Sequence, residues 1–371
     1  MTDLNGYPYG RSKNSAFFYF HGSTKRPVKF VILSIVLVNG ISLVKPEKSI
    51  MVKLVFTFAL ALIATFGQAQ TWETLKPQIT CTKRHECSGA AVNGKFYLMG
   101  GRGDKPVEVF DPAKNNWTKL NGAPFEMHHF QAVSYKGKIY VIGAFTGGYP
   151  HETPVENVYI YDPEKDSWTK SHEIPAERRR GAAGLVVYKD KFYLLGGAQD
   201  GHWADNRDYV DEYDPKTGAW KTLPSMPRLR DHFQAVVVDD KLYAVGGRRS
   251  FAKEGHGFEL TYPELDVYDF STEKWSTLEN YPLPTERAGS TTIPYKEGFL
   301  VIGGESDAQV QAHSEVEYFH PENGWKLLNH LNRGRHGFPA VLIDENLYLA
   351  AGCGNRGGNP ELNSIEKLAI D

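Results

Sequence analysis

The residues best suited to chemistry in this 371-residue sequence are arginines and histidines that recur side by side. Arg84–His85 and Arg335–His336 each stand shortly before an apolar run that ends in glycine. Guanidinium groups present paired donors that match the oxygens of carboxylate, sulfate or phosphate. A histidine near neutrality can give or take a proton. Together these residue types predict a site that binds an anion and catalyses by acid and base.

Aligning the runs on their glycines places five arginines at equivalent positions, with Met127 as the sixth member. The predicted ligand-binding arginines are Arg84, Arg180, Arg230, Arg287 and Arg335. The predicted acid–base groups are His128, His129, His232, Asp231 and Glu286, with Glu86 and Glu305 beside them. We assign His85, His336 and Trp203 to ligand binding. For each arginine alone, a structural bond to loop carbonyls or to a neighbouring acid explains its presence as well.

The elements that position these residues come from an internal repeat. Six related runs recur, as in "VNGKFYLMGG", "KFYLLGG" and "VDDKLYAVGG"; all end in glycine except "YKGKIYVIGA", which ends at Ala144. After five of them comes a segment such as "VEVFDPAKNNW" that closes on a tryptophan. The sixth run has none, but Trp72, in "TWETLKP", stands upstream of the first. Short β-branched and aromatic segments bounded by Gly, Asp, Pro and Asn predict strands, and four per repeat predict antiparallel propeller blades.

Through the Gly-Gly doublet, the Tyr-Asp-Pro turn and the tryptophan, the chain resembles the kelch-repeat β-propellers from Trp72 to Asp371. We therefore expect an all-β fold of six blades, with the strand near Trp72 completing the blade that contains Leu347 to Ile370. Such closure leaves no open sheet edge. The glycines are expected to allow close backbone approach, and the tryptophans to pack between blades.

The order of strands in a blade places the predicted site on one face. The residues before the first strand, after the second and after the fourth emerge together, so the arginines should ring the mouth of the central channel. The longest loops, such as "FTGGYPHETPVEN" and "AQDGHWADNRD", share that face. Loops on a rigid scaffold commonly carry function. Trp203, outside the repeat pattern, is either a stacking platform for a sugar or a loop-packing residue.

Among enzymes, the sequence resembles the secreted bacterial six-bladed kelch proteins that include N-acetylneuraminate epimerase. That resemblance implies an acidic sugar, an arginine for its carboxylate and an acidic residue for proton transfer. We predict that the chain binds or acts on a sialic, uronic or sulfated sugar or oligosaccharide, as an epimerase, mutarotase or other acid–base enzyme. The alternative is a kelch module that binds glycans or proteins without catalysis.

Metal and thiol chemistry are not expected from the sequence. Three cysteines, Cys81, Cys87 and Cys353, show no CxxC spacing, so a structural zinc site is disfavoured, and their pairing stays open. The Glu-x-x-x-Asp-x-x-x-His iron motif of plant specifier proteins is absent, and the domains that accompany copper in kelch-type galactose oxidases have no room. We predict neither a metal nor another cofactor.

Residues 51–69, "MVKLVFTFALALIATFGQA", read as a secretory signal peptide. We expect Met51 as the start, residues 1–50 as a non-native extension, and residues 70–371 as a mature propeller in a periplasm or outside the cell, without stable membrane association. The apolar run from Phe30 to Val44 is short for a membrane span and is interrupted by polar residues. A formal net charge of −2 gives no support for nucleic-acid binding.

Overall fold

The computed structural model describes residues 71–370 of the chain. The predicted signal peptide and the apolar run upstream of it lie outside the described residues. Between residues 71 and 370, no helix has the length and apolar character needed to cross a membrane. The described part is almost entirely β-structure, with two 3₁₀ turns, η1 (Ala176–Arg178) and η2 (Ala252–Glu254).

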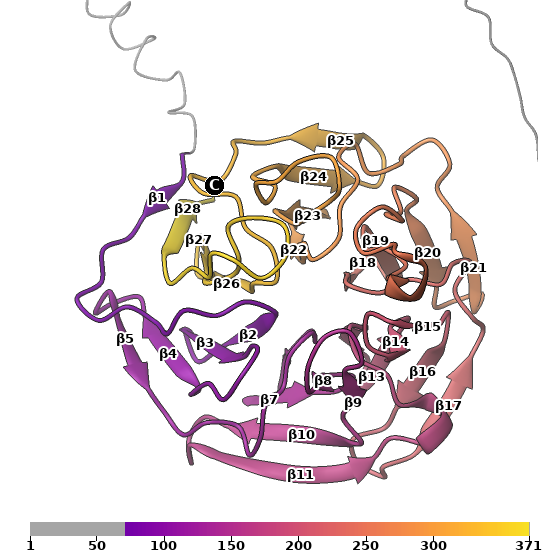
Figure 1. Cartoon of the computed structure of the whole chain (residues 1–371), viewed down its shortest axis with the longest axis horizontal. Helices are drawn as coiled ribbons and strands as arrows, with labels where there is room; N and C mark the ends of the chain where they lie inside the picture. Colours follow the sequence, from indigo (N-terminus) through magenta and orange to yellow (C-terminus); the bar gives the residue numbers. More distant parts are fainter. Residues whose placement is uncertain (1–70, 371) are drawn as a thin grey trace, which may run out of the picture. The chain divides into compact units, whose positions relative to one another are not determined.

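Six four-stranded antiparallel sheets stand around a central axis, as Figure 1 shows. Blade 1 contains β2 (Cys87–Val92), β3 (Lys95–Gly100), β4 (Glu108–Asp111) and β5 (Asn116–Lys119). Blade 2 contains β6 (Val133–Tyr135), β7 (Lys138–Val141), β10 (Asn157–Asp162) and β11 (Ser167–Glu173). Blade 3 contains β12 (Gly184–Tyr188), β13 (Lys191–Leu195), β16 (Val210–Tyr213) and β17 (Trp220–Leu223).

The remaining blades repeat the same order of strands. Blade 4 contains β18 (Gln234–Val238), β19 (Lys241–Val245), β20 (Asp266–Asp269) and β21 (Lys274–Thr277). Blade 5 contains β22 (Thr291–Tyr295), β23 (Gly298–Ile302), β24 (Val316–His320) and β25 (Gly324–Leu327). Blade 6 contains β26 (Ala340–Ile343), β27 (Asn346–Ala350), β28 (Ile365–Ala369) and β1 (Glu73–Thr74). The first strand of each blade faces those of its neighbours, so these strands surround the axis.

The ring closes as the sequence predicts, because β1 pairs with β28. Glu73 lies opposite Lys367 in this antiparallel pair. Trp72 takes the place of the missing sixth tryptophan: its side chain is 6% exposed and its indole N–H donates to the carbonyl of Asn329, at 3.0 Å. Trp220 and Trp275 make the same kind of bond to the preceding blade, through the carbonyls of Glu173 and Pro224. These tryptophans therefore tie their blades to the one before, whereas the indole nitrogens of Trp117 and Trp168 have no hydrogen-bond partner among the described residues.

Glycine serves the turns and the close approach of blades. The hairpin between β2 and β3 turns at Asn93 and Gly94, both with positive φ, which matches the twist of the strands. Gly197, in a Gly-Gly doublet, has a φ of +91°, and a β-carbon there would stand 2.5 Å from the carbonyl oxygen of Gly181. Only glycine fits that position without a shift of the backbone.

The three cysteines are unpaired and buried, which answers the question that the sequence left open. Cys81 and Cys87 pack in the apolar cluster between blades 1 and 6 with Phe96. Burial raises the pKa of the Cys87 thiol to about 12. A thiol in that state is a poor nucleophile and packs as a small apolar group.

Candidate functional site

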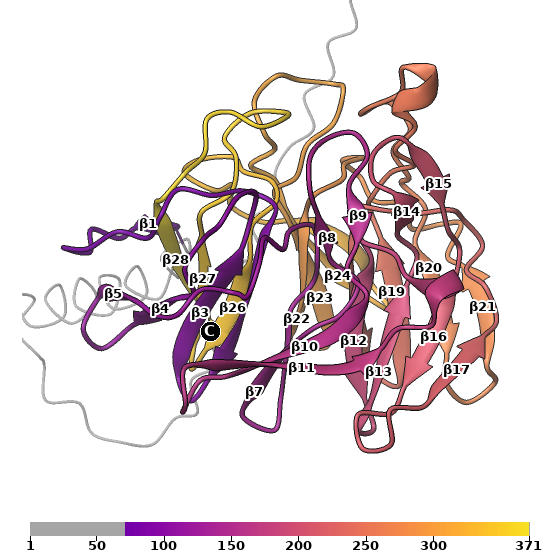
Figure 2. The same ribbon diagram turned by 60° about the horizontal axis from the view of Figure 1, so that its bottom comes forward.

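The long loops gather on one side of the ring, where they form a cup around the channel mouth. Figure 2 shows the loops with the hairpins β8 (Phe145–Thr146) to β9 (Thr153–Pro154) and β14 (Ala198–Asp200) to β15 (Ala204–Asn206) on that side. The cup has a volume of about 430 Å³. Its lining includes His85, Glu86, Arg102, His129, Tyr149, His202, Arg248, Phe258, Glu305 and His336.

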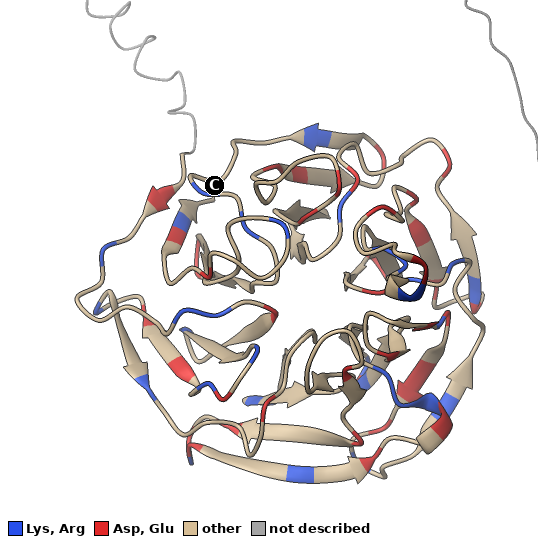
Figure 3. Cartoon of the chain, in the orientation of Figure 1, with Lys and Arg blue, Asp and Glu red and all other residues tan. Residues whose placement is uncertain are grey.

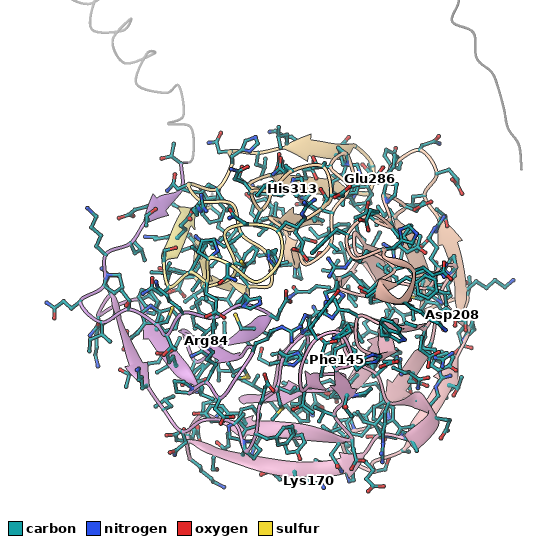
Figure 4. The ribbon with its side chains drawn as sticks, in the orientation of Figure 1. Arg84, Phe145, Lys170, Asp208, Glu286 and His313 are labelled. Atoms are coloured by element: carbon teal, nitrogen blue, oxygen red, sulfur yellow. The ribbon has the colours of Figure 1, made fainter. Side chains whose placement is uncertain are left out.

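The five arginines in register do not line this cup, and the expectation that they face the channel mouth is wrong. All five side chains have no exposed surface. Each pairs with a carboxylate on the third strand of its own blade. These pairs are Arg84–Glu108, Arg180–Asp211, Arg230–Asp266, Arg287–Glu317 and Arg335–Glu366. Figure 4 labels Arg84 within its blade, whereas Phe145 lies nearer the axis.

The same guanidinium groups bind the backbone where the second strand ends. Arg287 Nε donates to the carbonyl of Gly303 at 2.6 Å, and Arg335 Nη1 donates to that of Ala351 at 2.8 Å. In blade 2, Met127 stands in place of the arginine, and both Met127 and Tyr159, on the third strand, belong to one apolar cluster. The structural role that the sequence offered for each arginine alone accounts for these contacts, with the acid in the same blade rather than a neighbouring one.

One wall of the cup carries a buried chain of charges. Glu86 Oε1 lies 3.3 Å from His336 Nδ1, and His336 Nε2 lies 3.4 Å from Glu305 Oε2. Arg248 Nη1 donates to Glu305 Oε1 at 2.6 Å. The Nδ1 atom of His336 makes no well-aligned hydrogen bond among the described residues, although Glu86 is near. Two carboxylates therefore flank a histidine beside an arginine, and Nε2 of that histidine donates to the carbonyl of Gly357, at 2.8 Å.

The charged neighbours in this wall stabilise the ionised forms of His336 and Glu305. Burial opposes the imidazolium form, but Glu305 and Glu86 outweigh it and hold the pKa of His336 well above its ordinary value. Burial likewise opposes the carboxylate form of Glu305, yet His336 and Arg248 keep the pKa of that group below its ordinary value. At neutral pH the wall thus presents an imidazolium, a guanidinium and two carboxylates.

Next to this wall lies a cluster of three histidines, of which His129 and His202 line the cup. The rings of His129, His202 and His232 have centroids 4.6–5.1 Å apart. His202 Nδ1 lies 2.8 Å from Glu152 Oε1, and Glu152 also pairs with Arg102. One nitrogen from each of the three histidines lies within 4.8 Å of the others, as do donor atoms of Glu86, Glu305 and His336. Both sets have donor types that could hold a metal ion.

Several predicted residues support the cup from behind or lie away from it. Asp231 is fully buried and accepts bonds from Ser250, at 2.7 and 2.8 Å, and from Asn206 and His232. Asp231 therefore orients His232 and does not face the cup. His128 is also fully buried, between His129 and the carbonyl of Gly147.

Glu286 and Trp203 are not among the residues that line the cup. Glu286 is exposed and accepts a hydrogen bond from the Thr261 hydroxyl, at 3.1 Å; Figure 4 labels it toward the rim of the ring. Its prediction as an acid–base group is therefore wrong in its placement. Trp203 packs against His151, with ring centroids 4.8 Å apart and the ring planes tilted by 42°, in keeping with the loop-packing interpretation.

Sequence reasoning missed Arg102, Arg248, Glu152 and His202. Arg102 and Arg248 each follow a Gly-Gly doublet directly, at the position that Glu305 occupies in blade 5. The position directly after the glycine doublet could have identified both arginines as site residues, because the chain emerges at the cup there. Glu152 and His202 lie in long loops outside the repeat, where no register locates them.

Comparisons with known proteins agree with this architecture. A family model described as the Attractin/LZTR1 beta-propeller matches residues 61–312. Kelch-like protein terF of Aspergillus terreus is 27% identical over 313 residues, which cover 76% of this chain and 64% of terF. Kelch-like protein 23 of Homo sapiens is 27% identical over 283 residues, which cover 74% of this chain and 46% of that protein. The chain thus spans less than two thirds of these relatives.

A solved structure supports the same fold. The structure of YjhT superposes with a TM-score of 0.65 at 18% sequence identity, covering 78% of this chain and 96% of YjhT. An identity this low is informative about fold alone. Six blades, the recurring glycines and tryptophans, and the match of more than half of the sequence lead to one conclusion: the chain belongs to the Attractin/LZTR1 β-propeller family and is a six-bladed kelch-repeat propeller.

Proposed function

We propose that the cup binds a small carboxylated carbohydrate and exchanges protons with it. The observation that carries this proposal is the buried wall of Glu86, His336, Glu305 and Arg248. A proton donor and proton acceptors stand there within 3.4 Å of one another, next to a cavity of about 430 Å³. Cavities of this size suit small ligands, and general acid–base catalysis needs groups within hydrogen-bond reach of the same substrate.

The preference for an acid comes from specific donors and not from an excess of positive charge. Around the cup, Arg102, Arg248 and His336 balance Glu86, Glu305 and Glu152, and Figure 3 shows basic and acidic segments mixed around the ring. Arg102, however, has only its Nη2 atom engaged among the described residues, with Glu152. Its remaining N–H groups are free to form a paired contact with a ligand carboxylate.

The preference for a sugar comes from the combination of polar groups with aromatic rings. Phe258 and Tyr149 line the cup beside the charged wall, and the Tyr149 side chain is 63% exposed. Aromatic faces pack against the C–H groups of sugars, while charged side chains bind their hydroxyls and carboxylates. The sequence resemblance to secreted kelch proteins that include N-acetylneuraminate epimerase supports the same ligand class. Export of this chain is part of the proposal.

Binding without turnover is the competing function, and one experiment separates the two. A panel of sialic, uronic and sulfated sugars is screened by thermal shift, and the ligands that bind are followed by NMR for anomer exchange or conversion. We expect a carboxylated sugar both to bind and to show exchange that depends on the protein. Binding with no exchange would assign the chain to the non-catalytic modules.

Replacing Arg102 with alanine is expected to weaken the best ligand of this panel by about one to two orders of magnitude. A charge-assisted hydrogen bond contributes roughly 1.5–3 kcal/mol, which corresponds to that loss. Isothermal titration calorimetry measures the change. The matched control is Arg207→Ala: both arginines are about a quarter exposed and paired with an acid, but Arg207 pairs with Asp205 and does not line the cup. Equal affinities of the two folded variants would refute the role of Arg102.

A further inference from the structure

The three histidines His129, His202 and His232 share an arrangement that their surroundings impose. They come from different parts of the chain: His129 precedes β6, His202 lies in the turn between β14 and β15, and His232 precedes β18. All three residues are at least nine-tenths buried, with exposures of 5%, 8% and 6%. Three imidazoles packed this closely need either hydrogen-bond partners or a common ligand.

Two of the histidines have Nδ1 beside a carboxylate. Asp231 accepts a bond from Nδ1 of His232, so in that ring Nδ1 carries the proton and Nε2 carries a lone pair. Glu152 Oε1 lies 2.8 Å from Nδ1 of His202, although this contact is not a well-aligned hydrogen bond. The Nε2 atom of His232 has no partner among the described residues. An unpartnered buried lone pair of this kind calls for a ligand.

The third histidine reaches the same state through a relay. The carbonyl of Gly147, 2.9 Å from His128 Nε2, can only accept, so His128 is protonated at Nε2. In a neutral His128 ring, Nδ1 then accepts from Nδ1 of His129, at 2.6 Å. His129 is left with a lone pair on Nε2, only 3.4 Å from a carboxylate oxygen of Glu86. A lone pair facing a carboxylate is unfavourable unless a proton or a metal cation lies between them.

We propose that His129, His202 and His232 form a binding site for a divalent transition-metal cation, with Zn²⁺ as the best match. Three neutral imidazoles with an open fourth position are typical of catalytic zinc sites. Asp231 and Glu152 serve as the outer carboxylates that orient ligating histidines. A cavity of about 40 Å³ is lined by Glu86, His129 and His232, and His202 lines the neighbouring cup together with His129. The donor nitrogens lie within 4.8 Å of one another, so binding draws the most distant of them together by up to about 1.5 Å.

The fourth position would be filled by Glu86, by water or by an oxygen of a ligand in the cup. His129 and His202 line the cup, so an ion held by them is accessible from it. The sequence predicted no metal, because no spacing along the chain marks these three residues. The proposal does not depend on a sugar, since all three donors belong to the protein.

The test uses the full propeller chain, first stripped with a chelator and then titrated with Zn²⁺ alone. We expect one ion per chain by calorimetry and by elemental analysis after gel filtration. Cobalt substitution should give the intense visible absorption of a tetrahedral Co²⁺ site. His232→Ala and His202→Ala should each lose the stoichiometric ion and this spectrum. His256→Ala, which changes a half-exposed histidine in another loop, should retain both.

Glu152→Gln provides a second test that leaves the three ligands in place. It should weaken Zn²⁺ binding by about 10–100-fold, the usual effect of losing an outer carboxylate. Circular dichroism establishes that each variant is folded. The proposal is overturned if the wild-type chain takes up no stoichiometric metal. It is overturned equally if folded His232→Ala and His202→Ala variants bind Zn²⁺ as tightly as His256→Ala does.

Discussion

The variant Arg287→Met is expected to lower the free energy of unfolding by about 3–5 kcal/mol, the usual cost of removing one partner from a buried ion pair. Arg287 has no exposed surface, and Nη1 lies 2.6 Å from Glu317. The substitution leaves Glu317 charged and without its counterion, and it also removes the donor to the Gly303 carbonyl. Chemical denaturation monitored by tryptophan fluorescence measures the loss.

Blade 2 supplies the matched rescue. There Met127 and Tyr159 replace the arginine and the acid and pack in one apolar cluster. The double variant Arg287→Met/Glu317→Tyr copies that pair into blade 5. Replacing a buried ion pair by apolar residues of similar volume is often neutral, so the double variant should regain most of the lost stability. A single variant as stable as the wild type would contradict the structural role of the arginine ring.

A second large effect is expected for Glu305→Gln, which should reduce turnover of the carbohydrate by about two to four orders of magnitude, the range for a lost acid–base group. Glu305 contacts both His336, at 3.4 Å, and Arg248, at 2.6 Å. The amide can neither accept the substrate's proton nor balance these cations. NMR exchange rates at saturating ligand measure the change. Glu286→Gln, an exposed carboxylate away from the cup lining, is the control and should retain full activity.

The pH profile of the wild type gives the same prediction a second readout. A base acts above its pKa and an acid below its pKa. The pKa of Glu305 is lowered from 4.5, and that of His336 is raised well above 6.5. The rate of turnover should therefore not change with pH between pH 4.5 and pH 6.5. A rate that changes through this interval with the slope of a single ionisation would show that another group controls the chemistry.

The sequence was sufficient to predict the fold because each repeat carries its own glycine, turn and tryptophan markers. The closure of the ring is predictable too: Trp72 supplies the marker that the sixth repeat lacks, and β1 pairs with β28 as expected. The acidic partners of the arginines were also predictable. In each arginine-bearing repeat whose third strand ends in a turn Asp or His, an acid stands three residues before that turn residue, as Glu317 does before His320. Blade 2, which lacks the arginine, has Tyr159 at this position. The arginine position and the acid position, considered together, predict structural ion pairs and so distinguish the five arginines from the residues of the ligand site.

The cup was only partly legible. His336, Glu86 and Glu305 follow the repeat register, and the sequence placed them on the correct face. Loops whose lengths differ between blades supply His202, Glu152 and Phe258. Their positions depend on packing between loops, such as the hydrogen bond from the backbone N–H of Trp203 to the carbonyl of Pro150, at 2.9 Å. No periodicity encodes such contacts, so the histidine cluster emerges only in three dimensions.

The most direct test of the proposed function is a crystal structure of the propeller with the tightest carboxylated sugar from the panel. We expect density for the sugar in the cup of about 430 Å³, with its carboxylate on Arg102 and a hydroxyl within hydrogen-bond distance of Glu305 or His336. Density in the separate cavity of about 340 Å³ that the first strands line, or at the outer rim, would contradict the account.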